Sequence, residues 1–175
     1  MAQLDKVYFM ETNANNQEHK YNSLLLESNI MSCSFDQVTR HLMVSMRPSQ
    51  KCAKVRHQVY EMVYTPSHAV AEVSAEQPAA QNYAINLVQT FLGSTEQKML
   101  AKSKLFVMEN NELYASVSDE HSRSLNLWSV NRNELSWKLS NSSEVLDSCS
   151  IRVDNGLSNV ICRVTDKQLR IFRRN

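Results

Sequence analysis

The chain has 175 residues, with 19 Lys and Arg, 18 Asp and Glu, and a formal net charge of +1. This length suffices for one domain with a real core, and the balanced charge argues against a dedicated nucleic-acid or membrane-surface binder. No apolar run approaches the roughly 18 residues of a spanning helix, and the N-terminal residues lack the apolar core of a secretory signal. The composition therefore predicts a protein of the cytosol or nucleus.

Two compositional features limit the chemistry. Gly occurs only twice, which rules out Gly-rich phosphate-binding loops. Asn, Ser and Asp are expected to form the turns, since Asn and Asp tolerate positive φ better than most residues. The four cysteines form no C-x-x-C pair, so the spacing predicts no zinc finger or redox dithiol. Cys33, Cys149 and Cys162 fall in predicted strands and are interpreted as buried, reduced thiols.

The first half of the chain has the period-two alternation of short strands. Residues 65–82 interrupt this pattern with Ala, Ser, Glu and two prolines. They are predicted to form an inserted surface loop with a short helical turn near 69–73. The connector 94–104 is expected to hold another helical turn at 96–100. Strands are predicted at 5–12, 21–27, 30–35, 41–46, 54–64 and 83–92.

The stretch 105–139 contains the clearest repeat unit. Its four short apolar runs are separated by polar turns, which is typical of an antiparallel meander. Three final strands are predicted at 146–153, 158–164 and 168–173. Trp128, in the third run, precedes Phe172 by about the 40–45 residues of a WD-type blade. The spacing predicts an all-β fold of antiparallel four-stranded blades, a partial WD-repeat β-propeller, with an irregular sandwich or barrel as the alternative.

The aromatic residues Tyr60, Trp128 and Phe172 each centre a third-strand candidate and are predicted to form blade cores. The whole chain, 1–175, is interpreted as one partial propeller of about three and a half blades, whereas closed propellers have about four to eight. We therefore expect open edges through which the chain could pair with another chain. The blade-like units are predicted at about 1–29, 30–92, 105–139 and 145–174.

The sequence contains no nucleophile elbow and no H-E-x-x-H motif, so we predict no catalytic residue, no metal site and no cofactor. The turn Asp119-Glu120-His121 could be an acid–base or metal cluster, but turn carboxylates more often cap backbone donors. A local basic stretch fits either a surface for an acidic partner or DNA phosphate, or solvated strand edges. Its candidate partner-binding residues are Arg40, Arg47, Lys54 and Arg56, with His41, Lys51 and His57 nearby.

Several segments match one family in order and spacing. They are T-R-H-L-M-V-S-M-R-P at 39–48, V-Q-T-F-L-G at 88–93, L-N-L-W at 125–128, V-L-D-S-C at 145–149 and V-T-D-K-Q-L-R-I-F at 164–172. Together they resemble the C-terminal propeller of the RING-finger and WD-repeat ubiquitin ligases of the Fanconi anaemia and replication-stress pathway. The resemblance covers nearly the whole chain.

The resemblance implies a protein-binding propeller that recognises substrate for a nuclear ubiquitin ligase, with replication protein A as partner. It also implies action in the replication-stress response and DNA repair, in the nucleus and also in the cytoplasm. The sequence departs from the family pattern, since it has no RING Cys/His array, no heptads and about half a propeller. Ligase chemistry is therefore not expected from these residues. The alternatives are a stand-alone WD-like scaffold without a ligase link, and a small β-fold enzyme.

Overall fold

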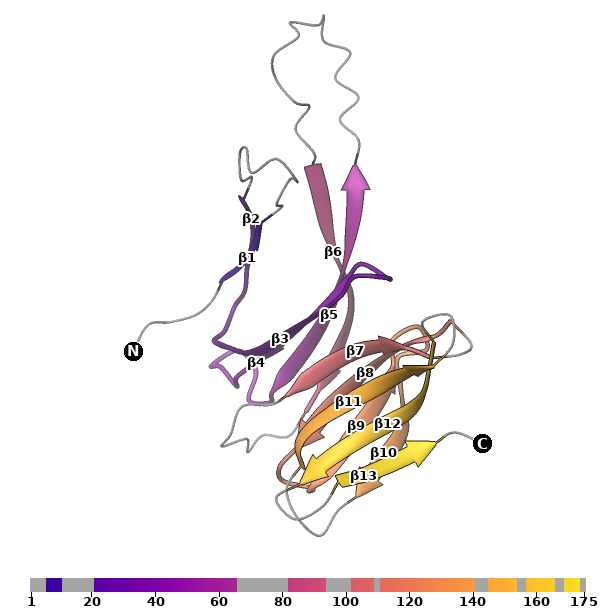
Figure 1. The fold of residues 1–175 in the computed structure, drawn as a ribbon. Helices are drawn as coiled ribbons and strands as arrows, with labels where there is room; N and C mark the ends of the chain where they lie inside the picture. The colour runs from indigo at the N-terminus through magenta and orange to yellow at the C-terminus, as the bar shows by residue number, and fades with distance from the viewer. Residues whose placement is uncertain are drawn as a thin grey trace, which may run out of the picture.

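A computed structural model shows that the chain is all-β (Figure 1). It describes residues 6–10, 21–65, 82–93, 102–108, 111–140, 145–153, 157–165 and 169–173. Every regular element within these ranges is a strand, and they contain no helix that could cross a membrane. The loop predicted over 65–82 falls largely outside the described residues, and both predicted helical turns lie wholly outside them.

The strands pair with their neighbours along the chain and form four antiparallel sheets. The sheets are β1–β2, β3–β6, β7–β10 and β11–β13. In chain order the strands are β1 (Lys6–Met10), β2 (Tyr21–Leu25), β3 (Ile30–Asp36), β4 (His41–Met46), β5 (Arg56–Thr65), β6 (Asn82–Leu92), β7 (Ser103–Val107), β8 (Leu113–Asp119), β9 (Ser124–Ser129), β10 (Glu134–Ser140), β11 (Val145–Val153), β12 (Leu157–Thr165) and β13 (Leu169–Arg173).

Consecutive sheets pack face to face, as blades of a propeller do. Strand β7 packs against β3 and β4 of the preceding sheet, and β11 packs against β7, β8 and β9. The first strands of the second, third and fourth sheets, β3, β7 and β11, thus lie near one another (Figure 1). The predicted antiparallel four-stranded blades of a partial propeller are confirmed, in place of a sandwich or barrel.

The apolar core lies between the sheets. Met43, Val59 and Phe91 of the second sheet pack with a group from the third sheet that includes Leu105 and Ala115. The opposite face of the third sheet carries a separate cluster of Phe106, Met108, Tyr114, Leu125 and Leu127. A further cluster joins the β1–β2 and β3–β6 sheets, with Leu26, Leu42, Val44, Met46 and Tyr60 at its centre.

This layering explains why the central strands lack clean alternation. In β4 all residues from Leu42 to Met46 are buried, and in β8 all residues from Leu113 to Ser118 are buried. A strand covered by a sheet on each side buries both of its faces. Strand β10, at the outer edge of its sheet, is instead exposed or half-buried along its length.

The turns use positive φ at residues other than Gly. Asn111 and Asn133 have φ of 57° and 55°, as expected for Asn in a Gly-poor chain. Arg40 and Arg123 adopt φ of 57° and 47°, although positive φ is uncommon for arginine. The β3–β4 turn that contains Arg40 is held by Asp36, whose carboxylate accepts hydrogen bonds from the backbone of Val38 and Thr39, both at 3.0 Å.

The interpretation of Cys33 as a buried thiol is wrong, because Cys33 is exposed on β3. The pairing of β3 with β4 shifts register between Ile30 and Ser32. Met31 is buried just at this bulge, whereas Cys33 and Phe35 beyond it are exposed. A bulge changes which face of the sheet the following residues occupy, and the sequence pattern does not reveal its position.

Candidate functional site

Three of the four candidate partner-binding residues gather at one end of the second sheet. Arg47 follows β4, Lys54 lies in the loop before β5, and Arg56 begins β5. Arg47 and Lys54 are exposed. The loop is closed by reciprocal backbone hydrogen bonds between Ser49 and Cys52, which donate to each other's carbonyl oxygens at 2.8 and 3.1 Å. We call Arg47, Lys51, Lys54 and Arg56 the β4–β5 basic cluster.

The β4–β5 basic cluster is anchored to the segment that enters β3. Ser28 Oγ donates to the carbonyl oxygen of Arg47 at 2.7 Å, and the Arg47 amide donates to the carbonyl oxygen of Asn29 at 2.9 Å. Both contacts fix the backbone at Arg47, so its exposed side chain projects from a defined point. Such a preordered position lowers the entropy lost when a partner binds.

Glu27 partly neutralises the cluster. Its carboxylate lies 3.2 Å from Arg56 Nη1 and 3.5 Å from Lys51 Nζ. The hydrogen bond from Arg56, with the charge of Lys51, lowers the pKa of Glu27. Only 14% of the Arg56 side chain is exposed, and its buried Nε and Nη2 atoms have no hydrogen-bond partner. Arg47 and Lys54 are therefore the members best placed to meet a partner's carboxylates.

Arg40 lies apart from the other candidates. It occupies the β3–β4 turn, and its carbonyl oxygen accepts a hydrogen bond from the Met62 amide at 2.9 Å. Strand β4 separates this turn from Arg47, because Arg40 precedes the strand and Arg47 follows it. The residues of the basic stretch thus lie at two separate sites, one at each end of β4.

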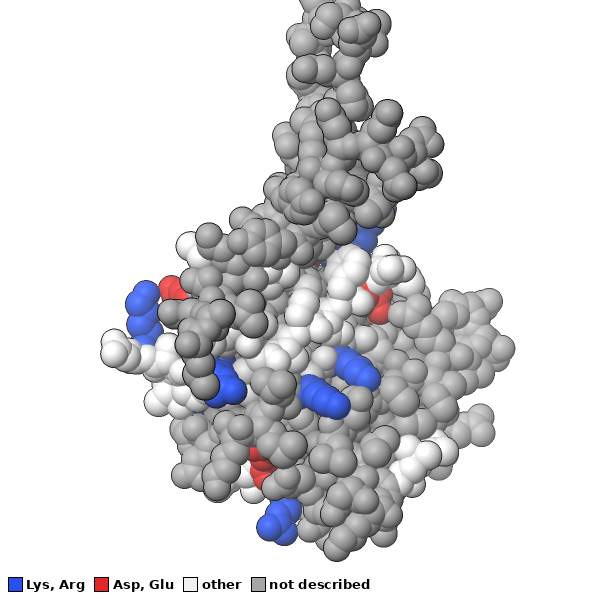
Figure 2. All heavy atoms as spheres, turned by 60° about the vertical axis from the view of Figure 1, so that its left-hand side comes forward, with Lys and Arg blue, Asp and Glu red and all other residues white. Residues whose placement is uncertain are grey.

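Basic side chains are also dispersed over the rest of the visible surface. Figure 2 shows Lys and Arg in ones and twos on the face that it displays, with Asp and Glu between them. No single continuous basic patch is visible there among the described residues.

His57 does not belong to the charged surface, although the sequence analysis placed it in the basic stretch. It is 1% exposed, and burial lowers the pKa of its imidazole to about 4, with Asp119 acting weakly in the opposite direction. His57 Nδ1 lies 2.7 Å from Ser45 Oγ. Ser45 Oγ donates onward to Ser103 Oγ at 2.8 Å, so the histidine is the donor in its own bond. The imidazole is therefore neutral, with a buried Nε2 that has no partner.

Ser103 extends this polar chain between two sheets. It lies in β7, whereas Ser45 and His57 lie in β4 and β5. Ser103 Oγ is also 2.8 Å from Ser32 Oγ of β3. Four polar side chains thus form one hydrogen-bonded chain where the second and third sheets meet, which orients the two sheets more specifically than apolar contacts alone.

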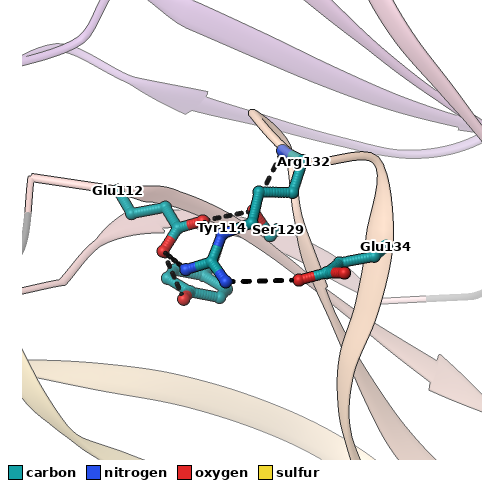
Figure 3. Close-up of polar contacts among 5 residues, drawn as sticks. All are labelled: Glu112, Tyr114, Ser129, Arg132 and Glu134. Carbon is teal, nitrogen blue, oxygen red and sulfur yellow. Dashed lines mark hydrogen bonds and ion pairs between the residues drawn. The ribbon is translucent and has the colours of Figure 1, made fainter.

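The most extensive polar network centres on the buried carboxylate of Glu112 (Figure 3). Arg132 donates to both carboxylate oxygens, from Nε and Nη2, at 2.7 Å each. Tyr114 donates its hydroxyl to Oε2 at 2.7 Å, and Ser129 donates its hydroxyl to Oε1. Arg132 also reaches Glu134 at 3.3 Å, where both side chains are exposed. The hydrogen bond to Glu112 raises the pKa of Arg132.

The sequence does not reveal this network, because Glu112 stands in one of the polar segments that separate the apolar runs of 105–139. Glu112 directly precedes β8, Tyr114 lies in β8, Ser129 ends β9, and Arg132 lies in the β9–β10 turn. They meet only through the register that sets Tyr114 opposite Ser129. The arrangement joins three segments of one blade and pairs the buried Glu112 carboxylate with the Arg132 guanidinium. It is therefore a structural element of the blade rather than a reactive site.

The Asp119 turn is also structural. Its carboxylate accepts hydrogen bonds from the Ser122 amide at 3.2 Å and the Ser122 hydroxyl at 2.9 Å. This is the capping interpretation of the turn. Among the described residues no group of three or more His, Cys, Asp or Glu side chains is arranged to hold a metal ion.

The three aromatic residues predicted as blade cores lie in the third strands of their sheets, β5, β9 and β13. Tyr60 is buried and joins the cluster between the first and second sheets. Trp128 is half-buried and stacks on Phe91 of β6, with ring centroids 5.0 Å apart. It thus contacts the neighbouring sheet. Phe172 lies in β13 opposite Ile161, and its side chain is outside the described part of the chain.

Comparison with known proteins gives a consistent family. A model described as the E3 ubiquitin-protein ligase RFWD3 WD40 domain matches residues 1–173. Proteins named E3 ubiquitin-protein ligase RFWD3 are 31% identical over 137 residues in Ailuropoda melanoleuca, 30% over 158 residues in Mus musculus and 26% over 137 residues in Homo sapiens.

These matches cover most of the chain and a small part of each relative. They span 77%, 89% and 77% of the chain in the same order of species. They span 16%, 19% and 16% of the relatives. The chain thus spans less than a fifth of the length of the curated relatives that it matches.

Proposed function

Because the chain belongs to the family of the E3 ubiquitin-protein ligase RFWD3 WD40 domain, we propose that it recognises a protein substrate for a ubiquitin ligase. The family match over residues 1–173 carries this proposal. The packed blades support it, since propellers present rigid loops and strand edges to protein partners. The ligase reaction itself is assigned to the whole family protein, of which this chain corresponds to a minor part.

We further propose replication protein A as the substrate, with action in the nucleus during replication stress and DNA repair. This part rests on the resemblance of the matched sequence segments to replication-stress ligases. We propose that the β4–β5 basic cluster takes part in binding, because Arg47 and Lys54 are exposed on an anchored loop. Ion pairs at such positions raise the association rate more than they lengthen the complex lifetime.

The experiment is a binding titration of the folded chain with purified replication protein A, at low and at physiological salt. The double variant Arg47→Glu/Lys54→Glu is expected to weaken binding about tenfold at low salt and less at higher salt, since exposed charges are screened. Arg40→Glu is the control, because it reverses one charge at the other end of β4, against two in the double variant. Its binding is expected to stay close to that of the unchanged chain.

The outcomes separate the proposals. If both variants weaken binding equally, replication protein A would still be the substrate, but its contact would lie outside the β4–β5 basic cluster. A folded chain that fails to bind replication protein A at any salt would reject this substrate. It would favour the alternative of a WD-like scaffold with a different partner.

A further inference from the structure

The backbone register of the fourth sheet sets two cysteines opposite one another. Cys149 of β11 is the direct partner of Cys162 of β12. The register is uninterrupted around this pair, from Asp147 opposite Val164 to Ile151 opposite Val160. The two strands lie side by side in the sheet (Figure 1). No sequence spacing reveals this pair, because it exists only once the hairpin has formed.

Direct partners in an antiparallel ladder occupy the same face of the sheet, with Cα atoms about 4.5–5.5 Å apart. Disulfides bridge Cα atoms about 4.4–6.8 Å apart. The ladder therefore supplies the backbone spacing of a disulfide at Cys149 and Cys162 without moving either strand.

The face that carries both cysteines is open at the outer edge of the sheet. Cys162 is also the direct partner of Ile171 in β13, so Ile171 shares that face. Ile171 is 62% exposed, and Leu169, two residues earlier on the same face, is 64% exposed. Solvent thus reaches this face of the sheet at β13, the strand that neighbours β12.

We propose that Cys149 and Cys162 form a reversible cross-strand disulfide when the chain meets a peroxide. One thiolate attacks the peroxide, an S–O bond forms, the O–O bond breaks and hydroxide leaves. The second thiolate then attacks the resulting sulfenic sulfur, the S–S bond forms and a second hydroxide leaves. The two sulfurs together lose two electrons to the peroxide, and the two hydroxides take up the two protons that the thiols released and become two waters. A low-molecular-weight thiol reverses the reaction by exchange.

The bond would act on the β11–β12 hairpin. It would fix the register of the two strands that connect the third sheet to β13, and it would hold the hairpin closed when the sheet opens locally. Oxidation is therefore expected to slow amide hydrogen exchange in β11–β13 and to leave exchange in β3–β6 unchanged. This inference stands independently of the proposed substrate.

The experiment treats the folded chain with hydrogen peroxide, blocks the remaining thiols and maps the peptides by mass spectrometry without reduction. The expected product is a peptide pair joined through Cys149 and Cys162, which dithiothreitol separates. The variant Cys33→Ser/Cys52→Ser is expected to form the same product. Cys149→Ser and Cys162→Ser are each expected to abolish it.

Peptide mapping of the unchanged chain tests the proposed disulfide even if a cysteine variant fails to fold. The proposal is overturned if peroxide oxidises Cys149 and Cys162 to sulfinic or sulfonic acids without joining them. It is equally overturned if the joined peptides contain Cys33 or Cys52 instead. Retained thiols at both positions, under conditions that oxidise the exposed Cys33, would also reject it.

Discussion

At the scale of single residues, the blade formed by β7–β10 contains a buried carboxylate, Glu112, that is paired with the Arg132 guanidinium. Glu112 is 7% exposed and is held by Arg132, Tyr114 and Ser129. Charge-assisted hydrogen bonds are stronger than neutral ones, and a bidentate arginine adds a fixed geometry. Loss of one partner leaves the other desolvated without compensation, which costs more than the net contribution of the intact pair.

Replacing Arg132 is therefore expected to lower the free energy of unfolding. In Arg132→Ala the Glu112 carboxylate stays buried without its cation, and the expected loss is about 1–3 kcal/mol. We expect a value in the lower part of that range, because the arginine side chain is 55% exposed and water screens its charge. Urea denaturation measures the change. Glu134→Gln removes only the exposed partner and should alter stability by less than about 0.5 kcal/mol. Equal losses in both variants would contradict the assigned role of Glu112.

His57 gives the chain a stability term that depends on pH. Its pKa is about 4 in the folded chain, against an ordinary value of 6.5. Between these values the unfolded chain binds the proton more tightly than the folded chain does. The free energy of unfolding thus has its full value above pH 6.5 and falls as the pH drops toward 4, by about 3 kcal/mol in total.

The variant His57→Gln should remove this pH dependence. The difference in unfolding free energy between the two chains, measured by urea denaturation from pH 7.5 to 4.5, is expected to shrink as the pH falls. Carboxylates titrate in both chains and largely cancel in the difference. A constant difference for His57→Gln would mean that the folded imidazole titrates normally.

At the scale of elements, the end of β6 approaches β5 so closely that only Gly fits there. The Gly93 amide donates to the Val55 carbonyl oxygen at 2.8 Å. A Cβ at Gly93 would lie 2.9 Å from His57 Nε2 and 3.4 Å from Val55 Cβ. The His57 ring cannot easily withdraw, since it is buried and its Nδ1 is bonded to Ser45.

Gly93→Ala is accordingly expected to destabilise the chain by about 1–3 kcal/mol through overpacking. In a His57→Ala background the same substitution should cost clearly less, because the clashing ring is absent. Thermal or urea denaturation of the four chains in the double-mutant cycle measures this coupling. If the stability losses of the two single variants simply add, the cost of Gly93→Ala would come from a cause other than the His57 imidazole.

The positions of the strands could be predicted from sequence, whereas their contacts could not. The short apolar runs of 105–139 located β8 and β9, because such runs between polar turns are a local signal. The exposure of Cys33 depends on a bulge, and the burial of Glu112 depends on pairing between β8 and β9. Both are non-local. For the same reason the basic stretch could be listed, but its division between Arg40 and the β4–β5 basic cluster could not be foreseen.

At the scale of the whole molecule, the sheets are held together by packing across their faces. Phe91 of β6 is 2% exposed and stacks on Trp128 of β9, so one aromatic pair joins the second and third sheets. The serine–histidine chain from Ser32 to His57 crosses the same boundary. Apolar area and polar pairing thus act at one interface, which favours unfolding of the two sheets as one cooperative unit.

Phe91→Ala should therefore destabilise both sheets together, by about 3–5 kcal/mol. Trp128 would lose its stacking partner, and its fluorescence should shift to longer wavelength in the folded chain. Leu87→Ala is the control, since Leu87 lies on the same strand but is 53% exposed, and its effect should be below about 0.5 kcal/mol. Separate unfolding transitions for the two sheets in Phe91→Ala would contradict the cooperative picture.

The outer strand of the fourth sheet has a practical consequence for handling the protein. Strand β13 ends its sheet, and Leu169 and Ile171 on it are largely exposed. A flat edge with an apolar row is a template for ordered aggregation as concentration rises, and natural proteins blunt such edges with lysine. Leu169→Lys/Ile171→Lys would supply that charge without touching the first three sheets. This double variant is therefore expected to aggregate less at high concentration than the unchanged chain.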